Sequence, residues 1–365
     1  MMRTNHFSDA HIHIPEDLDR AFSMLCELRD YGIREMNILA ITDDEGYPVD
    51  NNLCALYLKQ KMTGAQVSVF GGLYYHPHLN HYGTPFLRQA QTLLDMGCDG
   101  LKFIEEKPNL RRQIGFGLNS KLYDGMFEML EERQVPIICH INDPEEYWSR
   151  EQILKWPIGE RLVEFGWLYD NDSFLTYDEI LSEMLERLER NPRLNIVFAH
   201  FMFLSHRLET ARELMETYPN LKFDLTPGWE MYAGFLERYD DWRAFFETCS
   251  DRILYGTDTN NFPIKKAIHE TVRYAVGGED REIPIPHAAF AHMRGFDLSQ
   301  AAQENICHRN YARLIGEPKP VNDGLLAEET ERMLELLRRN DGDADVIARL
   351  ERCLAALRIV DNSEI

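Results

Sequence analysis

Positively charged residues are scarce in this sequence. Lysine and arginine together number 39, against 61 aspartates and glutamates, which gives a formal net charge of −22 over 365 residues. A charge this negative disfavours binding to nucleic acid or to an anionic membrane surface, because both partners are themselves negative. We therefore expect no nucleic-acid partner and no membrane partner, which leaves a small molecule as the expected substrate.

Paired cysteines and long apolar runs are also missing. The seven cysteines are scattered and form no CxxC pair, which is typical of reduced thiols in a cytoplasmic protein. The first ten residues, MMRTNHFSDA, lack the apolar region of a signal peptide. The sequence has no run of about 18 apolar residues, so we expect no transmembrane helix and a cytoplasmic location. Hydrophobic residues still make up 44% of the chain, enough for a large core.

Short apolar runs alternate with longer helical patterns along most of the chain. The expected strands are 7–14, 35–42, 66–73, 98–105, 135–141, 194–200, 221–226 and 252–257. The helical patterns between them include 17–31, 84–96, 120–133, 177–190 and 206–218. Eight strands that alternate with helices predict an α/β fold, a closed (β/α)8 TIM barrel whose strands are buried on both faces. An open doubly wound sheet is the alternative, but the sequence has no GxGxxG opening a helix after a strand, so its nucleotide-binding form is disfavoured.

Two segments are additional to the eight strands and helices of the expected barrel. Residues 142–176 form a long loop after the fifth strand, rich in Trp, Tyr and Asp, and loops of that length are usually functional. We divide the chain into a barrel over residues 1–317 and a C-terminal helical extension over 318–365. The extension contains two amphipathic patterns, LLAEETERMLELLRRN and ADVIARLERCLAALRIV. Their apolar stripes must be buried on the barrel or on a partner subunit, and we expect a homodimer to which this extension contributes.

Histidines gather at the ends of the expected strands. His11 and His13 lie two residues apart in FSDAHIHI, so a strand places both imidazoles on one face. The fifth, sixth and eighth runs end with His140, His200 and Asp258. The carboxyl ends of barrel strands carry the chemistry in enzymes of this architecture. Imidazole and carboxylate together suit zinc and neighbouring divalent metals, so these positions predict a metal site.

This set of residues resembles the amidohydrolase superfamily, which has HxH on strand one, His on strands five and six, and Asp on strand eight. The finer resemblance is to the amidohydrolase-2 branch, the group of aminocarboxymuconate semialdehyde decarboxylase and related metal-dependent hydrolases. The supporting stretches are HINDPEEYW, GWLYDNDSFLTYDEIL, NPRLNIVFAH, ILYGTDTN and ENICHRNYARLIG. The resemblance runs from about residue 7 to about residue 316. It is specific for metal dependence and not for substrate, because the branch includes C–N hydrolases, lactonases and decarboxylases.

The resemblance implies roles for the same residues. His11, His13, His140 and Asp258 would hold one divalent ion, which we expect to be zinc, with manganese or a second, bridged metal as alternatives. His200 would transfer a proton, polarise the substrate or act as a further ligand. Asp258 would also take a proton from the attacking water.

Strand four carries two further candidates. Two-metal members of the superfamily bridge their ions with a carboxylated lysine or a glutamate at the end of this strand, where the present sequence reads DGLKFIEEKP. Lys102 or Glu105 could serve, but residues three apart face opposite sides of a regular strand, so we expect only one to point inward. The alternatives are that Lys102 contacts a substrate carboxylate and that Glu105 is a solvated loop residue.

Aromatic residues in the loops form a weaker group of candidates. Trp148 follows the fifth strand and Trp229 follows the seventh, so both can contact a substrate at the mouth of the barrel. Packing among the loop aromatics is the alternative, and applies equally to the neighbours Tyr147, Trp167 and Tyr169.

Histidines and arginines outside the strand ends are weaker still. The loop YYHPHLNHY contains His76, His78 and His81, which we interpret as structural or solvated, although His76 follows strand three. Arg111 and Arg112 either pair with an anionic substrate or lie on a helix surface.

The sequence therefore predicts a metal-dependent hydrolase. Its expected substrate is a small polar amide, lactone or related carbonyl compound, attacked by a metal-activated water. The alternative is a non-oxidative decarboxylase of a small unsaturated or aromatic carboxylic acid. A third interpretation, a non-catalytic barrel that only binds ligands, is disfavoured because all five strand-end residues are present.

Overall fold

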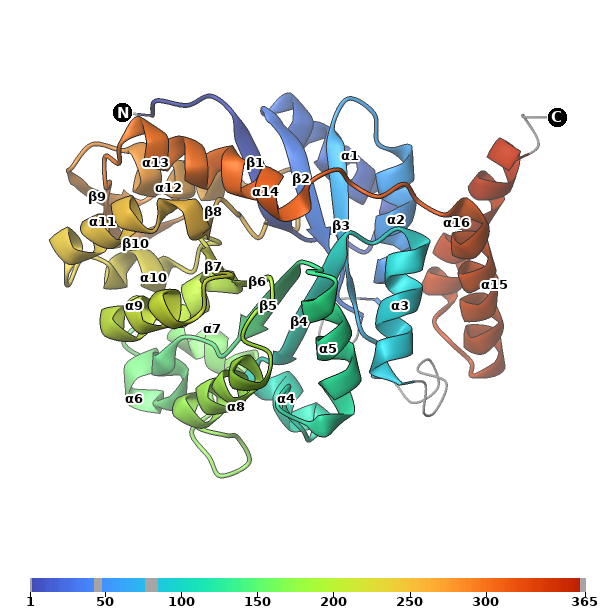
Figure 1. The fold of residues 1–365 in the computed structure, drawn as a ribbon, viewed down its shortest axis with the longest axis horizontal. Coiled ribbons are helices and arrows are strands. Elements are labelled where there is room, and N and C mark those ends of the chain that lie inside the picture. The colour runs from blue at the N-terminus through green and yellow to red at the C-terminus, as the bar shows by residue number, and fades with distance from the viewer. Residues whose placement is uncertain (1, 43–47, 76–84, 362–365) are drawn as a thin grey trace.

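Parallel strands surrounded by helices make up most of the structure (Figure 1). The computed structural model describes residues 2–42, 48–75 and 85–361, and the statements below refer to these residues. Its eight-stranded sheet follows the chain order from β1 to β8 without a crossover, and each neighbouring pair is parallel. This is the (β/α)8 TIM barrel that the sequence predicts. No helix in the described part combines the length and apolar character that a membrane crossing requires.

Each of the eight expected runs overlaps a strand. The strands are β1 Phe7–Ile12, β2 Ile33–Leu39, β3 Gln66–Gly72, β4 Gly100–Glu106, β5 Ile137–Ile141, β6 Ile196–Phe198, β7 Leu221–Asp224 and β8 Ile253–Leu254. The last strand is short, and the segment that follows it continues along β1. The amide of Ala10 donates to the carbonyl of Tyr255, and the amide of Asp258 donates to the carbonyl of His11. These bonds close the barrel between its first and last strands.

Helices on the outside of the barrel connect the strands. They are α1 Leu18–Asp30, α2 Asn51–Lys61, α3 Phe86–Met96, α4 Pro108–Ile114, α5 Asp124–Glu132, α8 Tyr177–Arg190, α9 Leu208–Thr217, α10 Trp229–Gly234, α11 Tyr239–Thr248, α12 Lys266–Gly277, α13 Gln300–Glu304 and α14 Asn310–Ile315. Their ends follow local chemistry. The side chain of Asp17 caps α1, and Thr176 and Glu179 form a reciprocal capping box on α8.

Strands β1 and β4 each contain an extra residue towards their carboxyl ends. Between Asp9 and Ile12, β1 advances three residues while β2 advances two, from Met36 to Ile38. Likewise, β4 advances from Phe103 to Glu106 while β5 advances from Cys139 to Ile141. An extra residue of this kind shifts the alternation of side chains by one position. Both irregularities lie towards the carboxyl ends of their strands, where the site is built.

The interior of the barrel is apolar at its amino-terminal end. A separate buried cluster consists of Ala10, Leu39, Phe70, Ile138, Val197, Ala199, Leu254, Tyr311 and Leu314. The last two come from α14, which therefore covers this end of the barrel. The hydroxyl of Tyr311 also lies 3.1 Å from that of Ser68 on β3. Because this end is packed, access to the interior is left to the opposite, carboxyl-terminal end.

The long segment after β5 is an ordered, packed structure. It contains α6 Arg150–Ile153 and α7 Gly159–Glu164. Its own small core consists of Tyr147, Ile153, Leu162, Leu168 and Tyr169. A second addition is an antiparallel pair, β9 Glu282–Ile285 and β10 Ala288–Arg294, which packs against α10. The sequence pattern did not predict this pair.

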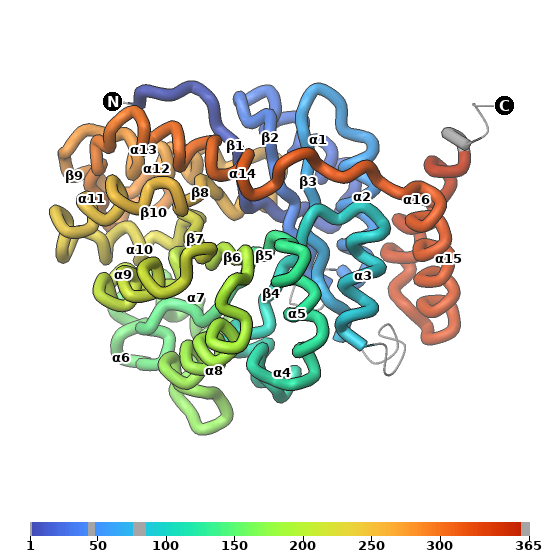
Figure 2. Tube along the Cα trace, in the orientation of Figure 1, coloured from blue at the N-terminus to red at the C-terminus, as the bar shows by residue number. Residues whose placement is uncertain are grey.

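The C-terminal extension is a pair of helices, α15 Asp323–Arg339 and α16 Ala344–Asp361. Figure 2 shows the chain leaving α14 and crossing the molecule to reach them beside α2 and α3. Their apolar stripes are buried, with Leu334 at 3% and Leu350 at 0% exposure. Arg349 of α16 pairs with the buried Asp50 that precedes α2. The stripes are therefore covered within one chain, and the homodimer stays a prediction.

Candidate metal centre

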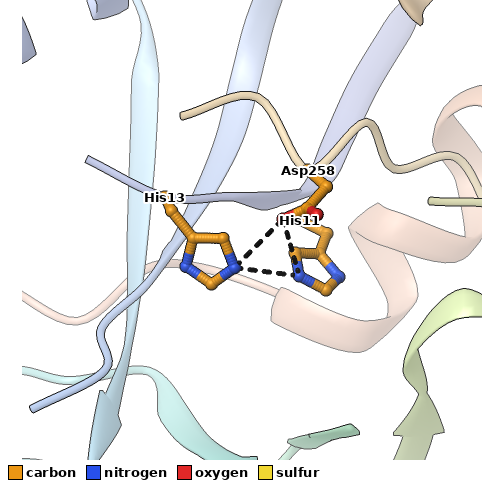
Figure 3. Close-up of side chains that lie close together, drawn as sticks. All are labelled: His11, His13 and Asp258. Carbon is orange, nitrogen blue, oxygen red and sulfur yellow. Dashed lines mark hydrogen bonds and ion pairs between the residues drawn. The ribbon is translucent and has the colours of Figure 1, made fainter. Parts of the chain in front are cut away.

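Three predicted residues converge where the barrel closes. His11 and His13 end β1, and Asp258 follows β8 on the segment hydrogen-bonded to β1 (Figure 3). Gly256 allows this segment to approach, because a Cβ at that position would lie 2.9 Å from Thr226 and 3.1 Å from the Cβ of His11. Asp258 itself has a left-handed backbone with φ of 55°. Strain of this kind is concentrated at functional sites.

The ligand atoms of the three residues lie within 4.8 Å of one another. The Nε2 atoms of His11 and His13 are 3.2 Å apart. The Oδ1 atom of Asp258 lies 3.6 Å from the first of these nitrogens and 3.2 Å from the second. The imidazoles are almost fully buried, whereas 37% of the Asp258 side chain is exposed. The group therefore opens to solvent on the side of the carboxylate.

The hydrogen bonds on the far side of each imidazole determine its tautomer. Nδ1 of His11 lies 2.8 Å from Oδ2 of Asp224, and Nδ1 of His13 lies 2.7 Å from the carbonyl oxygen of Leu39. A carbonyl and a carboxylate only accept, so both Nδ1 atoms carry the proton. In the neutral imidazoles, both Nε2 atoms then present lone pairs to each other and to the Asp258 carboxylate. Three acceptor atoms that converge in this way fit a bound cation.

The charge states agree with this interpretation. Burial lowers the pKa of His11 well below its usual value, so that its imidazole is neutral. Burial alone would raise the pKa of Asp258, but its contacts with His13, His11 and His200 lower it overall. A neutral imidazole and an ionised carboxylate are the forms that bind metal. The residues present therefore fit the divalent ion implied by the sequence.

Asp224 supports the site, and the sequence analysis did not identify it. It ends β7 and is fully buried. Its Oδ2 accepts from His11, and its Oδ1 accepts from the backbone amide of His200 at 2.8 Å. One carboxylate thus orients two predicted site residues. Its position at the end of a strand in LKFDLT was the available signal, because His140, His200 and Asp258 were selected on that ground.

His200 lies beside the three-residue group. Its ring centroid is 5.4 Å from that of His11, and its Nδ1 lies 3.3 Å from the carbonyl oxygen of Thr226. That bond places the proton on Nδ1 and leaves Nε2 with its lone pair. Burial lowers the pKa of His200 to about 4. The residue begins a run of left-handed backbone, with φ of 52°, that turns the chain sharply after β6.

His140 ends β5 and does not join the group of three. Its ring centroid is 4.8 Å from that of His200. Its Nε2 lies 2.9 Å from the carbonyl oxygen of Asn142 and 3.6 Å from Oδ1 of Asp143. The first bond assigns the proton to Nε2 and leaves Nδ1 as the atom able to act as a ligand. His140 is thus near the site, and its role as a ligand stays a prediction.

Lys102 and Glu105 contradict the expectation that only one of them faces inward. Both are 2% exposed, and both line the same small cavity. The extra residue in β4 explains this, because it shifts the alternation between the two positions. Glu106 consequently faces outward, where its side chain accepts from the amide of Leu118. Strand alternation was the wrong rule at this point in the chain.

The aromatic candidates pack against other aromatic residues. The indole of Trp148 donates to the carbonyl of Leu175 at 2.8 Å, and its ring lies edge-on to Tyr177. Trp229 packs edge-on to Trp156 and Phe290. Neither tryptophan contacts the three-residue group. Their predicted substrate contacts stay predictions, and the structure shows the packing that was the alternative.

The two arginines after β4 lie in helix α4. Arg111 forms a two-pronged ion pair with Glu183, with both N–O distances at 2.7 Å. The guanidinium of Arg112 lies 4.1 Å above the ring of Phe174. Both therefore link α4 to neighbouring segments. His76, His78 and His81 lie outside the described residues.

Comparison with solved structures supports the fold. An uncharacterised TIM-barrel protein from Bordetella bronchiseptica is 14% identical, with a TM-score of 0.54 over 85% of this chain and 98% of that chain. A probable 2-pyrone-4,6-dicarboxylic acid hydrolase from Acinetobacter baumannii, with citric acid bound, is 12% identical, with a TM-score of 0.50 over 86% and 100%. A 2,6-dihydroxybenzoate decarboxylase bound to 2,6-dihydroxybenzoate is 16% identical, with the same TM-score and coverage. At these identities, the similarity is evidence for the fold alone.

Comparison with family models identifies the family. No curated protein matches the sequence. The model described as amidohydrolase, of the amidohydrolase-2 branch, matches residues 95–316. This match spans more than half of the chain and includes His140, His200 and Asp258. This chain is therefore an enzyme of the amidohydrolase family.

Proposed function

We propose that this protein is a metal-dependent hydrolase that acts on a small polar carbonyl compound, such as an amide or a lactone. The observation that carries the proposal is the convergence of His11, His13 and Asp258, whose ligand atoms lie within 4.8 Å of one another. A metal site with about three protein ligands leaves a position for water or substrate, which is the catalytic rather than the structural type. The expected ion is zinc, one for each chain, with manganese or a second, bridged ion as alternatives.

The roles of the residues follow from their positions. A divalent ion, when bound, polarises a carbonyl oxygen and lowers the pKa of water. Asp258 is the most exposed of the three ligands, so its carboxylate can accept a proton from the attacking water. His200 has its Nε2 lone pair beside the group, so it can accept a proton there and then deliver that proton to the leaving group. Asp224 orients His11 and the backbone of His200.

A non-oxidative decarboxylase of a small unsaturated or aromatic carboxylic acid is the second candidate. The same residues would bind the oxygens of the substrate and protonate the carbon that loses carbon dioxide. One protein of similar fold is a 2,6-dihydroxybenzoate decarboxylase, and another is a probable 2-pyrone-4,6-dicarboxylic acid hydrolase. Those names motivate testing both reactions.

A substrate screen separates the two reactions. The purified enzyme is incubated with amides, lactones and unsaturated or aromatic carboxylic acids, while released acid or amine and released carbon dioxide are both measured. Hydrolysis that depends on metal and is lost in His13→Ala supports the proposal. Release of carbon dioxide without hydrolysis replaces the proposal with decarboxylation, and turnover that survives in His13→Ala contradicts the assigned site.

Assembly and location are also proposed. We propose a homodimer, because twofold dimers are the commonest soluble oligomers. Light scattering of the wild type tests this, and a monomeric mass would exclude it. Truncation after Pro320 tests the extension, because a truncated dimer would place the interface elsewhere. The seven cysteines are all free thiols, which supports the cytoplasmic location proposed from the sequence.

A further inference from the structure

A small cavity lies beside the metal centre, at the carboxyl ends of β2, β3 and β4. Lys102, Glu105, Tyr75, Ala40 and Gly72 are among the residues that line it. The cavity has room for about one water-sized group. It can therefore admit a single oxygen atom of a substrate rather than a whole ligand. It adjoins the metal centre through β2, because His13 is anchored on the carbonyl of Leu39 and the next residue lines the cavity.

The ammonium group of Lys102 has no hydrogen-bond partner among the described residues. An ammonium offers three donors, and a buried one without an acceptor is costly. The carboxylates whose charges act on this ammonium group have other partners, and the first of them, Asp224, accepts from His11 and from the amide of His200. Glu105 accepts from the hydroxyl of Tyr75 at 2.9 Å and from the amide of Ile104 at 2.7 Å, while Asp258 lies against His13. The cavity thus has a buried cation and lacks an anion that is hydrogen-bonded to it.

The charge of Lys102 also acts on the metal centre. Burial lowers its pKa, while Asp224 and Asp258 act in the opposite direction. Conversely, the charge of Lys102 contributes to the low pKa of His11. These mutual effects place the ammonium within electrostatic range of the metal ligands, on the interior side of β4.

We propose that Lys102 binds a carboxylate group of the substrate, away from the carbonyl group that reacts at the metal centre. This inference rests on the proposed function and names its substrate class, namely small carbonyl compounds that also carry a carboxylate. An anion satisfies the ammonium group, and charge-assisted hydrogen bonds are the strongest that such a site can form. Lys102 thereby determines specificity and the position of the substrate.

Matched probes test the proposal on the purified, metal-loaded protein. Glutaramate carries an amide and a carboxylate, like the proposed substrates, and glutaramide replaces the carboxylate with a second, uncharged amide of the same shape. Binding of each is measured by isothermal titration calorimetry to the wild type, to Lys102→Met and to Lys102→Gln. A Glu105→Gln variant serves as the control, because it alters the cavity and leaves the ammonium in place. Metal content is measured for every variant.

The expected result is that the wild type binds glutaramate at least tenfold more tightly than glutaramide. Both Lys102 variants should abolish that preference and keep the metal content and the glutaramide affinity of the wild type, while Glu105→Gln should keep the preference. Equal binding of the two probes to the wild type, or a preference that survives in both Lys102 variants, would overturn the proposal. Loss of metal from both Lys102 variants would also overturn it, because Lys102 would then hold the metal ion. These readouts do not require turnover, so a failure of the hydrolase proposal alone leaves the preference for glutaramate measurable.

Discussion

The carboxylate of Asp224 joins His11 to the backbone of His200, with both hydrogen bonds at 2.8 Å. The amide of asparagine has only one acceptor atom, its oxygen. In Asp224→Asn, the NH2 group therefore faces one of the two donors, His11 Nδ1 or the His200 amide, and that hydrogen bond is lost. We expect the variant to fold and to bind zinc about 10–100-fold more weakly. Equilibrium dialysis with elemental analysis measures this, with the exposed Asp251→Asn as a control. Unchanged zinc affinity would remove Asp224 from the support of the site.

Substitution of Asp258 tests whether its carboxylate accepts a proton during the reaction. Asp258→Asn keeps an oxygen that can act as a ligand and removes the group that accepts a proton at neutral pH. We expect a folded variant with much of its metal and with a rate about 10²–10⁴-fold lower, as is typical for positioned acid–base groups. Circular dichroism and metal content control for structure. A variant that keeps more than about a tenth of the wild-type rate would exclude this role.

His140 tests the extent of the ligand set. The sequence predicts it as a ligand, whereas the structure leaves it outside the group formed by His11, His13 and Asp258. If His140 ligates through its Nδ1 atom, His140→Ala should lower the metal content as much as His11→Ala does. Mass spectrometry of the purified proteins measures both. Metal content that falls in His11→Ala and stays at the wild-type level in His140→Ala would limit the ligands to the three residues.

Arg349 tests how the C-terminal helices are attached. Its guanidinium pairs with Asp50, which is fully buried, so Arg349→Met leaves a buried carboxylate without its cation. We expect a loss of about 2–4 kcal/mol in the free energy of unfolding, measured with urea. The control is Arg352→Met, which breaks the exposed pair with Asp19 and should cost less than about 1 kcal/mol. Equal losses in the two variants would contradict this assignment.

Glu230 predicts a specific dependence of stability on pH. Burial raises the pKa of this carboxyl from 4.5 to about 8. The folded protein therefore binds this proton more tightly than the unfolded chain does. The resulting contribution to the free energy of unfolding is fully present below about pH 4.5 and is lost as the pH rises to about 8. The free energy of unfolding of the wild type should fall relative to that of Glu230→Gln between pH 5 and about pH 8, by up to about 1.4 kcal/mol for each pH unit.

The exposed Glu160→Gln variant controls for that measurement. Its difference in stability from the wild type should stay constant over the same range. A constant difference for Glu230→Gln as well would show that this carboxyl does not titrate in that window.

The sequence determined the plan of the molecule. Eight apolar runs between helical patterns predicted the barrel, because strands buried on both faces need continuous apolar residues. The order of the strands followed from that architecture, and their carboxyl ends were the expected place for chemistry. His11, His13 and Asp258 were predicted to meet on this basis, although about 245 residues separate the last two in the sequence.

Tertiary structure decided the details that depend on exact register. The extra residue in β4 places Lys102 and Glu105 in one cavity, and no rule of strand alternation reveals such a residue. The support by Asp224 depends on the distance between side chains of β1 and β7, which the barrel brings together only when it closes. The burial of the apolar stripes of α15 and α16 against α2 and α3 likewise depends on contacts between elements that are far apart in the chain. The local sequence pattern indicates which face of an element is apolar. Contacts between distant elements depend instead on how all the elements pack together.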